Sequence, residues 1–168
     1  GDFTEVPFGD LGDMLEETQR LIDAGTPVIA EASFALDGLF CSVDILRNKG
    51  NGHVEIYEVK SSTAVSEIYL HDTAYQQYVL GGLGYKVDGV YLVHINPCYV
   101  RYGEIDLDEL FVIEDVKCYT DCRQTGIRDF LPEYVVGKGV KGYVYTGRVS
   151  RFKSTVKFSF NHGLEILD

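Results

Sequence analysis

The sequence has no long hydrophobic run and no N-terminal targeting segment. No apolar stretch approaches the length needed to span a membrane, and residues 1–10 have neither the basic region nor the apolar core of a signal peptide. We therefore expect a cytoplasmic protein without a membrane-bound part. With 168 residues, of which 45% are hydrophobic, the chain is long enough for one domain with a core of its own.

Cysteine is also scarce, and its spacing argues against two common kinds of site. The four cysteines (Cys41, Cys98, Cys118 and Cys122) are too few and too unevenly placed for the disulfide framework of a small secreted protein. Three residues separate Cys118 from Cys122, which is not a standard zinc spacing, and no nearby histidine completes a set of four ligands. We expect reduced thiols with a structural role.

Positive charge is scarce over most of the chain. The 15 Lys and Arg residues against 26 Asp and Glu give a net charge of −11, which argues against a nucleic-acid partner because phosphate contacts need cations. Residues 134–164 are the exception, since they contain no Asp or Glu but carry several basic residues. Such an asymmetry is a hint of contact with a polyanion.

The chain divides where this charge changes sign. We predict a core over residues 1–133 and a basic, aromatic-rich C-terminal extension over residues 134–168 that packs on the same domain. The alternation of apolar and polar residues in the extension predicts strands over 139–149 and 152–160. Two interpretations stay open. The strands form an antiparallel hairpin with a solvated basic face, or they line a groove for single-stranded nucleic acid, with aromatic rings between the cations Lys141, Arg148, Arg151 and Lys153.

Two apolar segments joined by a glycine-rich turn carry charges that need an explanation. If the second segment is a strand, its side chains alternate, so that Val54, Ile56, Glu58 and Lys60 share one face. Asp44 lies within the apolar segment before the turn. Burying a carboxylate in a sheet costs free energy unless a partner compensates its charge. These charged residues should therefore have partners.

Two interpretations account for the charges. One is a divalent metal held by Asp44, Glu58 and a backbone carbonyl, with Lys60 facing a substrate, because hard cations prefer oxygen ligands. The other is an ordinary ion-pair cluster at the edge of the sheet. The residue pattern alone favours neither.

The same residues resemble the motif of the PD-(D/E)XK nuclease superfamily, and most of all its RecB-type branch, which includes the nucleases of CRISPR spacer acquisition. In that branch an aspartate follows a hairpin, a (D/E)-x-K motif ends the next strand, and a helix carrying a glutamine comes after. Here those residues are Asp44, then Glu58-Val59-Lys60, then Gln76. The resemblance covers roughly residues 26–112.

The resemblance implies a restriction-endonuclease-like α/β (or α+β) fold, with a mixed central sheet flanked by helices. It also implies a Mg²⁺- or Mn²⁺-dependent DNA nuclease, exonuclease-like, in which Asp44, Glu58 and the carbonyl of Val59 hold the metal. Lys60 and Gln76 would complete the catalytic set with Asp44 and Glu58. Glu31 is a second-tier candidate, because RecB-type domains often have a glutamate just before the hairpin.

Two features depart from the family. Its helix glutamine is followed four residues later by a tyrosine, which is missing here whether the glutamine is Gln76 or Gln77. Some relatives carry an iron–sulfur cluster, but the cysteine spacings do not match theirs and we expect no cluster. A catalytically inactive domain of the nuclease fold, which binds nucleic acid or a protein, is therefore the alternative function.

The local patterns predict the elements around this motif. Helices are expected over residues 10–24 and 66–82, a strand over 27–36 that ends in an Asp37-Gly38 hairpin, a buried strand over 87–96 and a short helix over 107–111. The helix that ends near residue 82 is a crossover, so the strand ending at Lys60 and the next strand should be parallel. Because the sequence starts at Gly1 without methionine, we expect that it is processed, tagged or cut from a longer protein. The expected partners are DNA and an additional domain or the other subunits of a repair or recombination complex.

Overall fold

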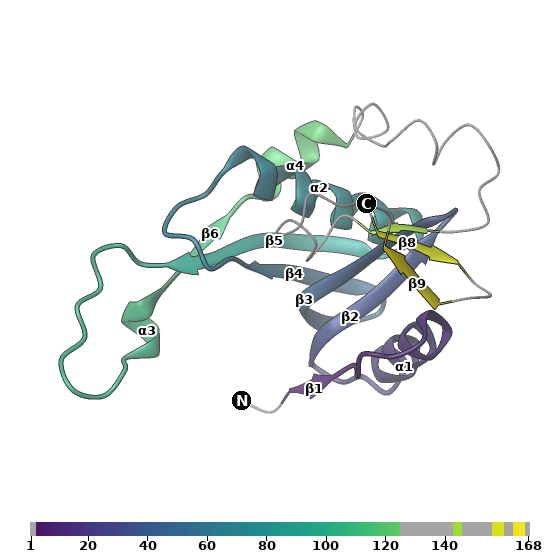
Figure 1. Cartoon of the computed structure of the whole chain (residues 1–168), viewed down its shortest axis with the longest axis horizontal. Coiled ribbons are helices and arrows are strands. Elements are labelled where there is room, and N and C mark those ends of the chain that lie inside the picture. The colour runs from purple at the N-terminus through teal and green to yellow at the C-terminus, as the bar shows by residue number, and fades with distance from the viewer. Residues whose placement is uncertain (1–2, 125–142, 146–155, 160–162, 167–168) are drawn as a thin grey trace.

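The described part of the chain is a mixed α/β domain. The computed structural model describes residues 3–124, 143–145, 156–159 and 163–166, and Figure 1 shows their arrangement. Up to residue 124 the elements are β1 (Thr4–Glu5), α1 (Leu11–Asp23), β2 (Val28–Leu36), β3 (Leu39–Gly50), β4 (His53–Val59), α2 (Glu67–Gly82), β5 (Lys86–Ile95), α3 (Leu107–Leu110), β6 (Phe111–Asp115) and α4 (Lys117–Arg123). None of these helices is long and apolar enough to cross a membrane.

The six strands form one mixed sheet in chain order. β1 pairs with β2 in parallel, β2–β3–β4 are antiparallel, β4 and β5 are parallel, and β6 runs antiparallel to β5 at the edge. Three short strands extend the sheet from the first residues of β3, namely β7 (Tyr143–Tyr145), β8 (Val156–Ser159) and β9 (Gly163–Ile166). The expected mixed central sheet with flanking helices is therefore confirmed.

Two tight hairpins bring the motif strands side by side. Asp37 and Gly38 have φ angles of 48° and 83°, and Asn51 and Gly52 have 54° and 76°. Positive φ at both central residues of a two-residue turn matches the right-handed twist of the strands that it joins, which is why Asp-Gly and Asn-Gly recur there. The predicted hairpin at Asp37-Gly38 is confirmed, and the two turns place β3 between β2 and β4.

The connection from β4 to β5 is the predicted crossover. α2 covers Glu67–Gly82, and the strands on either side of it pair in parallel, from His53 with Lys86 to Val59 with Val93. Ser66 is the N-cap residue, but its side chain makes no capping hydrogen bond. In Figure 1, α2 and α4 lie together above β5, whereas α1 lies beside β1 and β2.

The core lies between the sheet and these helices. α2 buries an apolar set that includes Leu70, Ala74, Val79 and Leu80, against strand residues that are also buried, such as Ile29, Leu46, Ile56, Val90 and Leu92. α1 buries Met14 and Leu21, and its Thr18 hydroxyl accepts a hydrogen bond from the backbone N–H of Ser33 at 2.9 Å. Both long helices therefore lie close to their predicted bounds and pack through their apolar faces.

The last third of the chain is described only in part. β7 and β8 fall within the two strands predicted for the extension, and they pair antiparallel. Lys141, Arg148, Arg151 and Lys153 lie outside the described residues. The nucleic-acid groove predicted for the extension therefore stays a prediction.

The four cysteines are free and separate into two groups. Cys41 is buried in β3, where burial raises the pKa of its thiol, so it is a structural thiol as expected. Cys98, Cys118 and Cys122 are exposed, and a role in the core does not account for them.

The packing of α2 makes a direct prediction about stability. Leu80→Ala should lower the free energy of unfolding by about 2–5 kcal/mol, because Leu80 is fully buried and the substitution leaves a cavity. Ile68→Ala, on the same helix but 57% exposed, should change it by no more than about 0.5 kcal/mol. Urea unfolding followed by circular dichroism measures both. Equal losses in the two variants would contradict the packing described here.

Candidate active site

Asp44 lies where the β3–β4 ladder ends. The last regular pair toward this end is Ile45 with Tyr57, and beyond it the backbone N–H of Val59 is hydrogen-bonded to the Asp44 carboxylate instead, at 2.8 Å. A side chain thus replaces the missing main-chain partner of an N–H group that needs one. This contact fixes Asp44 beside the Glu58-Val59-Lys60 motif.

Glu58 is a buried carboxylate with two partners from different parts of the chain. Glu58 is only 5% exposed. The Lys60 ammonium donates to Oε1 at 2.7 Å, and the side-chain amide of Gln76 on α2 donates to Oε2 at 2.7 Å. Charge-assisted hydrogen bonds of this kind are what make a buried carboxylate tolerable.

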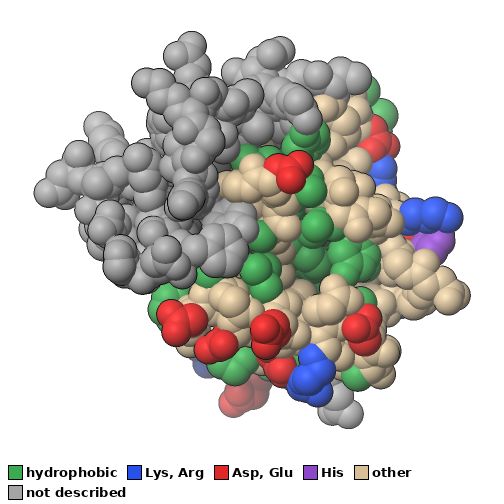
Figure 2. All heavy atoms as spheres, turned by 90° about the vertical axis from the view of Figure 1, so that its right-hand side faces the viewer, with side chains coloured by type: hydrophobic (Ala, Val, Ile, Leu, Met, Phe, Trp, Pro, Cys, Tyr) green, Lys and Arg blue, Asp and Glu red, His purple; other side chains and the backbone are tan. Residues whose placement is uncertain are grey.

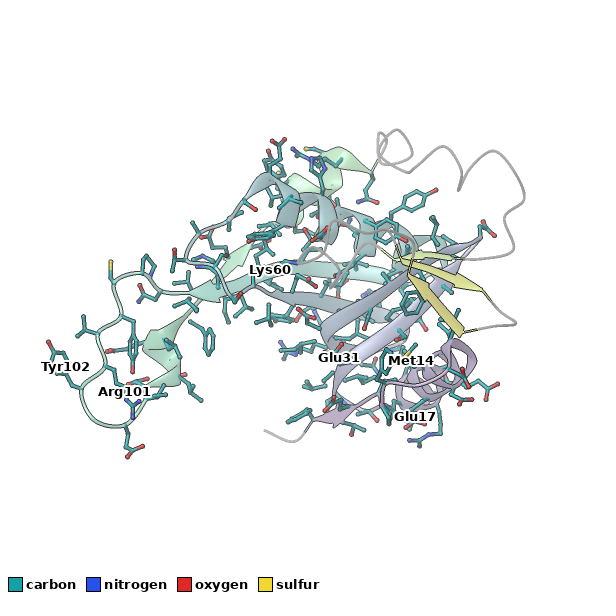
Figure 3. The ribbon with its side chains drawn as sticks, in the orientation of Figure 1. Met14, Glu17, Glu31, Lys60, Arg101 and Tyr102 are labelled. Atoms are coloured by element: carbon teal, nitrogen blue, oxygen red, sulfur yellow. The ribbon has the colours of Figure 1, made fainter. Side chains whose placement is uncertain are left out.

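Lys60 lies between two carboxylates. Besides its bond to Glu58, its ammonium donates to Asp72 on α2 at 3.1 Å, and it lies 5.1 Å from the centre of the Tyr69 ring. The Lys60 side chain is only 16% exposed, and that of Asp72 17%. Figure 3 shows Lys60 just beyond the end of β4.

The electrostatics of the cluster follow from burial and from an excess of negative charge. Burial raises the pKa of Glu58, and the nearby Asp44 carboxylate raises it further. Burial likewise raises the pKa of Asp72, against the opposing effect of Lys60. Burial disfavours the charged form of Lys60, but the Glu58 and Asp72 carboxylates outweigh it and raise the pKa of the amine.

The residues present fit a divalent cation. When Asp44, Glu58 and Asp72 are ionised beside Lys60, the cluster carries two more negative charges than positive ones. Its acceptors are carboxylate oxygens, the ligands that Mg²⁺ and Mn²⁺ prefer. No group of three or more His, Cys, Asp or Glu side chains in the described residues is arranged to hold a metal. The expected ligand set contains only two such side chains and a backbone carbonyl.

Gln76 adds an unsatisfied acceptor to the cluster. Its Nε2 donates to Glu58, while its Oε1 is buried and has no hydrogen-bond partner among the described residues. Buried polar atoms are rarely left unpaired, so such an atom calls for an explanation. A water or substrate group that donates a hydrogen bond would satisfy it.

The structure distinguishes the two candidate glutamines of α2. Gln76 points to Glu58, whereas Gln77 points to α4, where its amide donates to Asp121 at 2.6 Å and its carbonyl accepts from the Thr120 hydroxyl. Gln77 therefore belongs to the contact between the two helices, and Gln76, the residue that the resemblance named, is the one that contacts Glu58.

Glu31 lies one strand further away. It occupies the position across the ladder from Asp44, between the pairs Ala30–Ile45 and Ala32–Val43. Its φ of 57° is uncommon for a residue other than glycine, and its carboxylate accepts a hydrogen bond from Ser42 Oγ at 3.4 Å. Glu31 and Lys60 are well separated in Figure 3, so Glu31 stays a second-tier candidate at the margin of the cluster.

Asp72 and Tyr69 are cluster residues that the motif does not contain. The signal that could have found Asp72 is its spacing, because residues four apart lie on the same side of a helix and Asp72 precedes Gln76 by four. Tyr69 precedes Asp72 by three and lies on that side as well. Sequence patterns alone identify no partner for Lys60 on another element.

The surface around α1 differs in character from the cluster. Figure 2, in which the right-hand side of Figure 1 faces the viewer, shows acidic side chains gathered along the lower part of that face, where α1 lies. The helix and its N-cap contribute Asp10, Asp13, Glu16, Glu17 and Asp23. A face of this charge repels nucleic acid, because the phosphate backbone is itself negative.

Comparison of the chain with protein-family models, with curated proteins and with solved structures gives no match.

The repulsion between Asp44 and Glu58 predicts a pH-dependent effect of Asp44→Asn. At pH 7 without divalent metal, the substitution should raise the free energy of unfolding by on the order of 1 kcal/mol, because it removes a charge that disfavours ionised Glu58. An asparagine oxygen can still accept the hydrogen bond from Val59. The gain should shrink as the pH falls through the raised pKa of Glu58, since protonated Glu58 is no longer repelled.

Urea unfolding in EDTA between about pH 3 and pH 8 measures this effect, from below the ordinary carboxyl pKa values to well above them. Asp88→Asn is the matched control, because the Asp88 carboxylate is already paired with Lys49 and His53. It should give no such gain. A gain from Asp44→Asn that is the same at every pH would contradict the repulsion.

Proposed function

We propose that this chain is a divalent-metal-dependent DNA nuclease with a restriction-endonuclease-like fold, and an exonuclease by its resemblance to the RecB-type branch. The observation that carries the proposal is the convergence of four motif residues. Asp44 lies in β3, Glu58 in β4, Lys60 just beyond the end of β4 and Gln76 in α2. Lys60 and Gln76 are hydrogen-bonded to Glu58, and Asp44 to the backbone of Val59.

Each residue has a role that its surroundings support. Asp44 and Glu58, with the carbonyl of Val59, would hold Mg²⁺ or Mn²⁺. When bound, such an ion lowers the pKa of a coordinated water and offsets the charge that develops on the scissile phosphate. Lys60, held as an ammonium, would orient the attacking water and stabilise the phosphate oxygens electrostatically. Gln76 would position water or phosphate through its free Oε1.

The excess of negative charge in the cluster supports a bound metal rather than a metal-free ion-pair cluster. A closed ion-pair cluster in a partly buried position is expected to balance its charges, because uncompensated buried charge is costly. Here the cluster holds three carboxylates and one ammonium, which is hydrogen-bonded to two of them, Glu58 and Asp72, and the pKa of Glu58 is raised by burial and by Asp44. A divalent cation supplies the missing charge.

The alternative is a catalytically inactive domain of the same fold that binds nucleic acid or a protein. One observation favours it. The Lys60 ammonium is engaged by two carboxylates, Glu58 and Asp72, in the metal-free protein. A lysine fixed in this way could serve only to hold α2 against the end of β4. The net charge of −11 also favours a protein partner over DNA.

Cleavage assays distinguish the two functions. End-labelled linear DNA and closed circular DNA, single- and double-stranded, are incubated with Mn²⁺, Mg²⁺ or EDTA. We expect metal-dependent degradation that stops in EDTA, with circles spared if the enzyme is an exonuclease. Lys60→Ala should lower the cleavage rate by about 100-fold or more, since it removes a preorganised positive charge.

Lys49→Ala is the matched control, because Lys49 also lies between two carboxylates, Glu55 and Asp88, but outside the cluster. It should retain full activity. In melting experiments Mn²⁺ should stabilise the wild type and Lys60→Ala, by about 2.7 kcal/mol at a hundred times the Kd, but not Asp44→Ala. Full activity of Asp44→Ala would refute the assignment. No cleavage by a folded wild type under any metal would favour the inactive binding domain.

A further inference from the structure

We propose that Asp72 is a positioning residue, which holds the Lys60 ammonium in place when Glu58 turns toward a metal. This inference rests on the nuclease function proposed above and deepens it. It assigns a role to a residue that the nuclease motif does not include. It also explains why a third carboxylate lies in a cluster that already has two.

The contacts of Glu58 show why a second partner for Lys60 is needed. In the metal-free protein both oxygens of Glu58 are engaged, Oε1 by Lys60 and Oε2 by Gln76. A carboxylate oxygen that ligates a divalent cation has its charge drawn to that cation. The cation also repels the ammonium next to it. Lys60 therefore loses much of its attraction to Glu58 when Glu58 becomes a ligand.

Asp72 is the carboxylate that remains. Besides Glu58, two groups of the described residues lie near the Lys60 ammonium. The Asp72 carboxylate accepts its hydrogen bond at 3.1 Å, and the centre of the Tyr69 ring lies 5.1 Å from its nitrogen. Both come from α2 and so do not belong to the motif strands. An ion pair with Asp72 keeps the ammonium near its position, where it can reach the substrate phosphate.

The attachment of α2 makes this arrangement stiff. Gln76 and Asp72 lie four residues apart on the same helix, so the helix presents one group to Glu58 and the other to Lys60. On its neighbouring side Gln77 is bonded to Thr120 and Asp121 of α4, which resists rotation of α2. A positioning group works only when it is held in this way.

The kinetic test compares Asp72→Ala and Asp72→Asn with Asp72→Glu and the wild type. We expect the alanine and asparagine variants to lower kcat by about 10- to 100-fold with KM within about twofold, as for other residues that orient a catalytic group. Asp72→Glu, which keeps the charge, should recover most of kcat. Glu67→Gln, which removes a carboxylate from the exposed first turn of α2, should match the wild type.

A second measurement does not depend on cleavage. The rate at which an amine-acylating reagent modifies Lys60 is followed by peptide mass spectrometry, in EDTA and in Mn²⁺. Freeing the amine should raise this rate, so Asp72→Ala should be modified several-fold faster than the wild type. The difference should be larger in Mn²⁺, where Glu58 no longer holds the ammonium. Glu67→Gln should again match the wild type.

Two results would overturn the inference. If Asp72→Ala and the wild type are modified equally fast in Mn²⁺, Asp72 does not hold Lys60. If Asp72→Asn loses the Mn²⁺-induced rise in melting temperature, as Asp44→Ala is expected to, Asp72 is a metal ligand and not a positioning residue. A wild type that shows the expected modification rates but cleaves no DNA would refute the nuclease function while leaving the Asp72–Lys60 contact established.

Discussion

The burial of the Glu58 carboxylate is the constraint on which the rest of the site depends. A carboxylate that is only 5% exposed needs compensating partners, and the chain supplies them from two elements, Lys60 beyond the end of β4 and Gln76 on α2. The partners do not complete the compensation, because Asp44 and Asp72 add two further carboxylates. The metal-free protein therefore keeps a local excess of negative charge. Natural proteins retain such unfavourable arrangements mainly where function requires them.

The second organising feature is that the two sides of α2 make different contacts. One side presents Asp72 and Gln76 to the charged cluster, and the neighbouring side attaches to α4 through Gln77. Because β4 and β5 pair in parallel, the chain between them must cross over the sheet, and α2 is this crossover. The chemistry of the site is thus positioned by the same connection that builds the core.

The sequence predicted most of this architecture but not the contacts that join its parts. Periodicity located α1, α2 and β5, and the Asp37-Gly38 turn was evident because so few residues accept its backbone angles. The resemblance named Gln76 with Gln77 as the other candidate, but nothing in the sequence tells which side of α2 meets Glu58. That choice depends on α4, a seven-residue helix too short to be read from periodicity. The spacing of Asp72 from Gln76 puts it on the same side of α2, but an ion pair between distant elements leaves no pattern that names Lys60 as its partner.

Crystallography of the protein with Mn²⁺, in which the anomalous scattering of the ion locates it, tests the metal site most directly. We expect a peak bordered by Asp44, Glu58 and the carbonyl of Val59, with the Lys60 ammonium turned from Glu58 toward Asp72. A structure in which Mn²⁺ is absent from this cluster at a saturating concentration, or lies elsewhere while Lys60 keeps its bond to Glu58, would contradict the proposed site. The cluster would then be a metal-free ion-pair network that fastens α2 to the sheet.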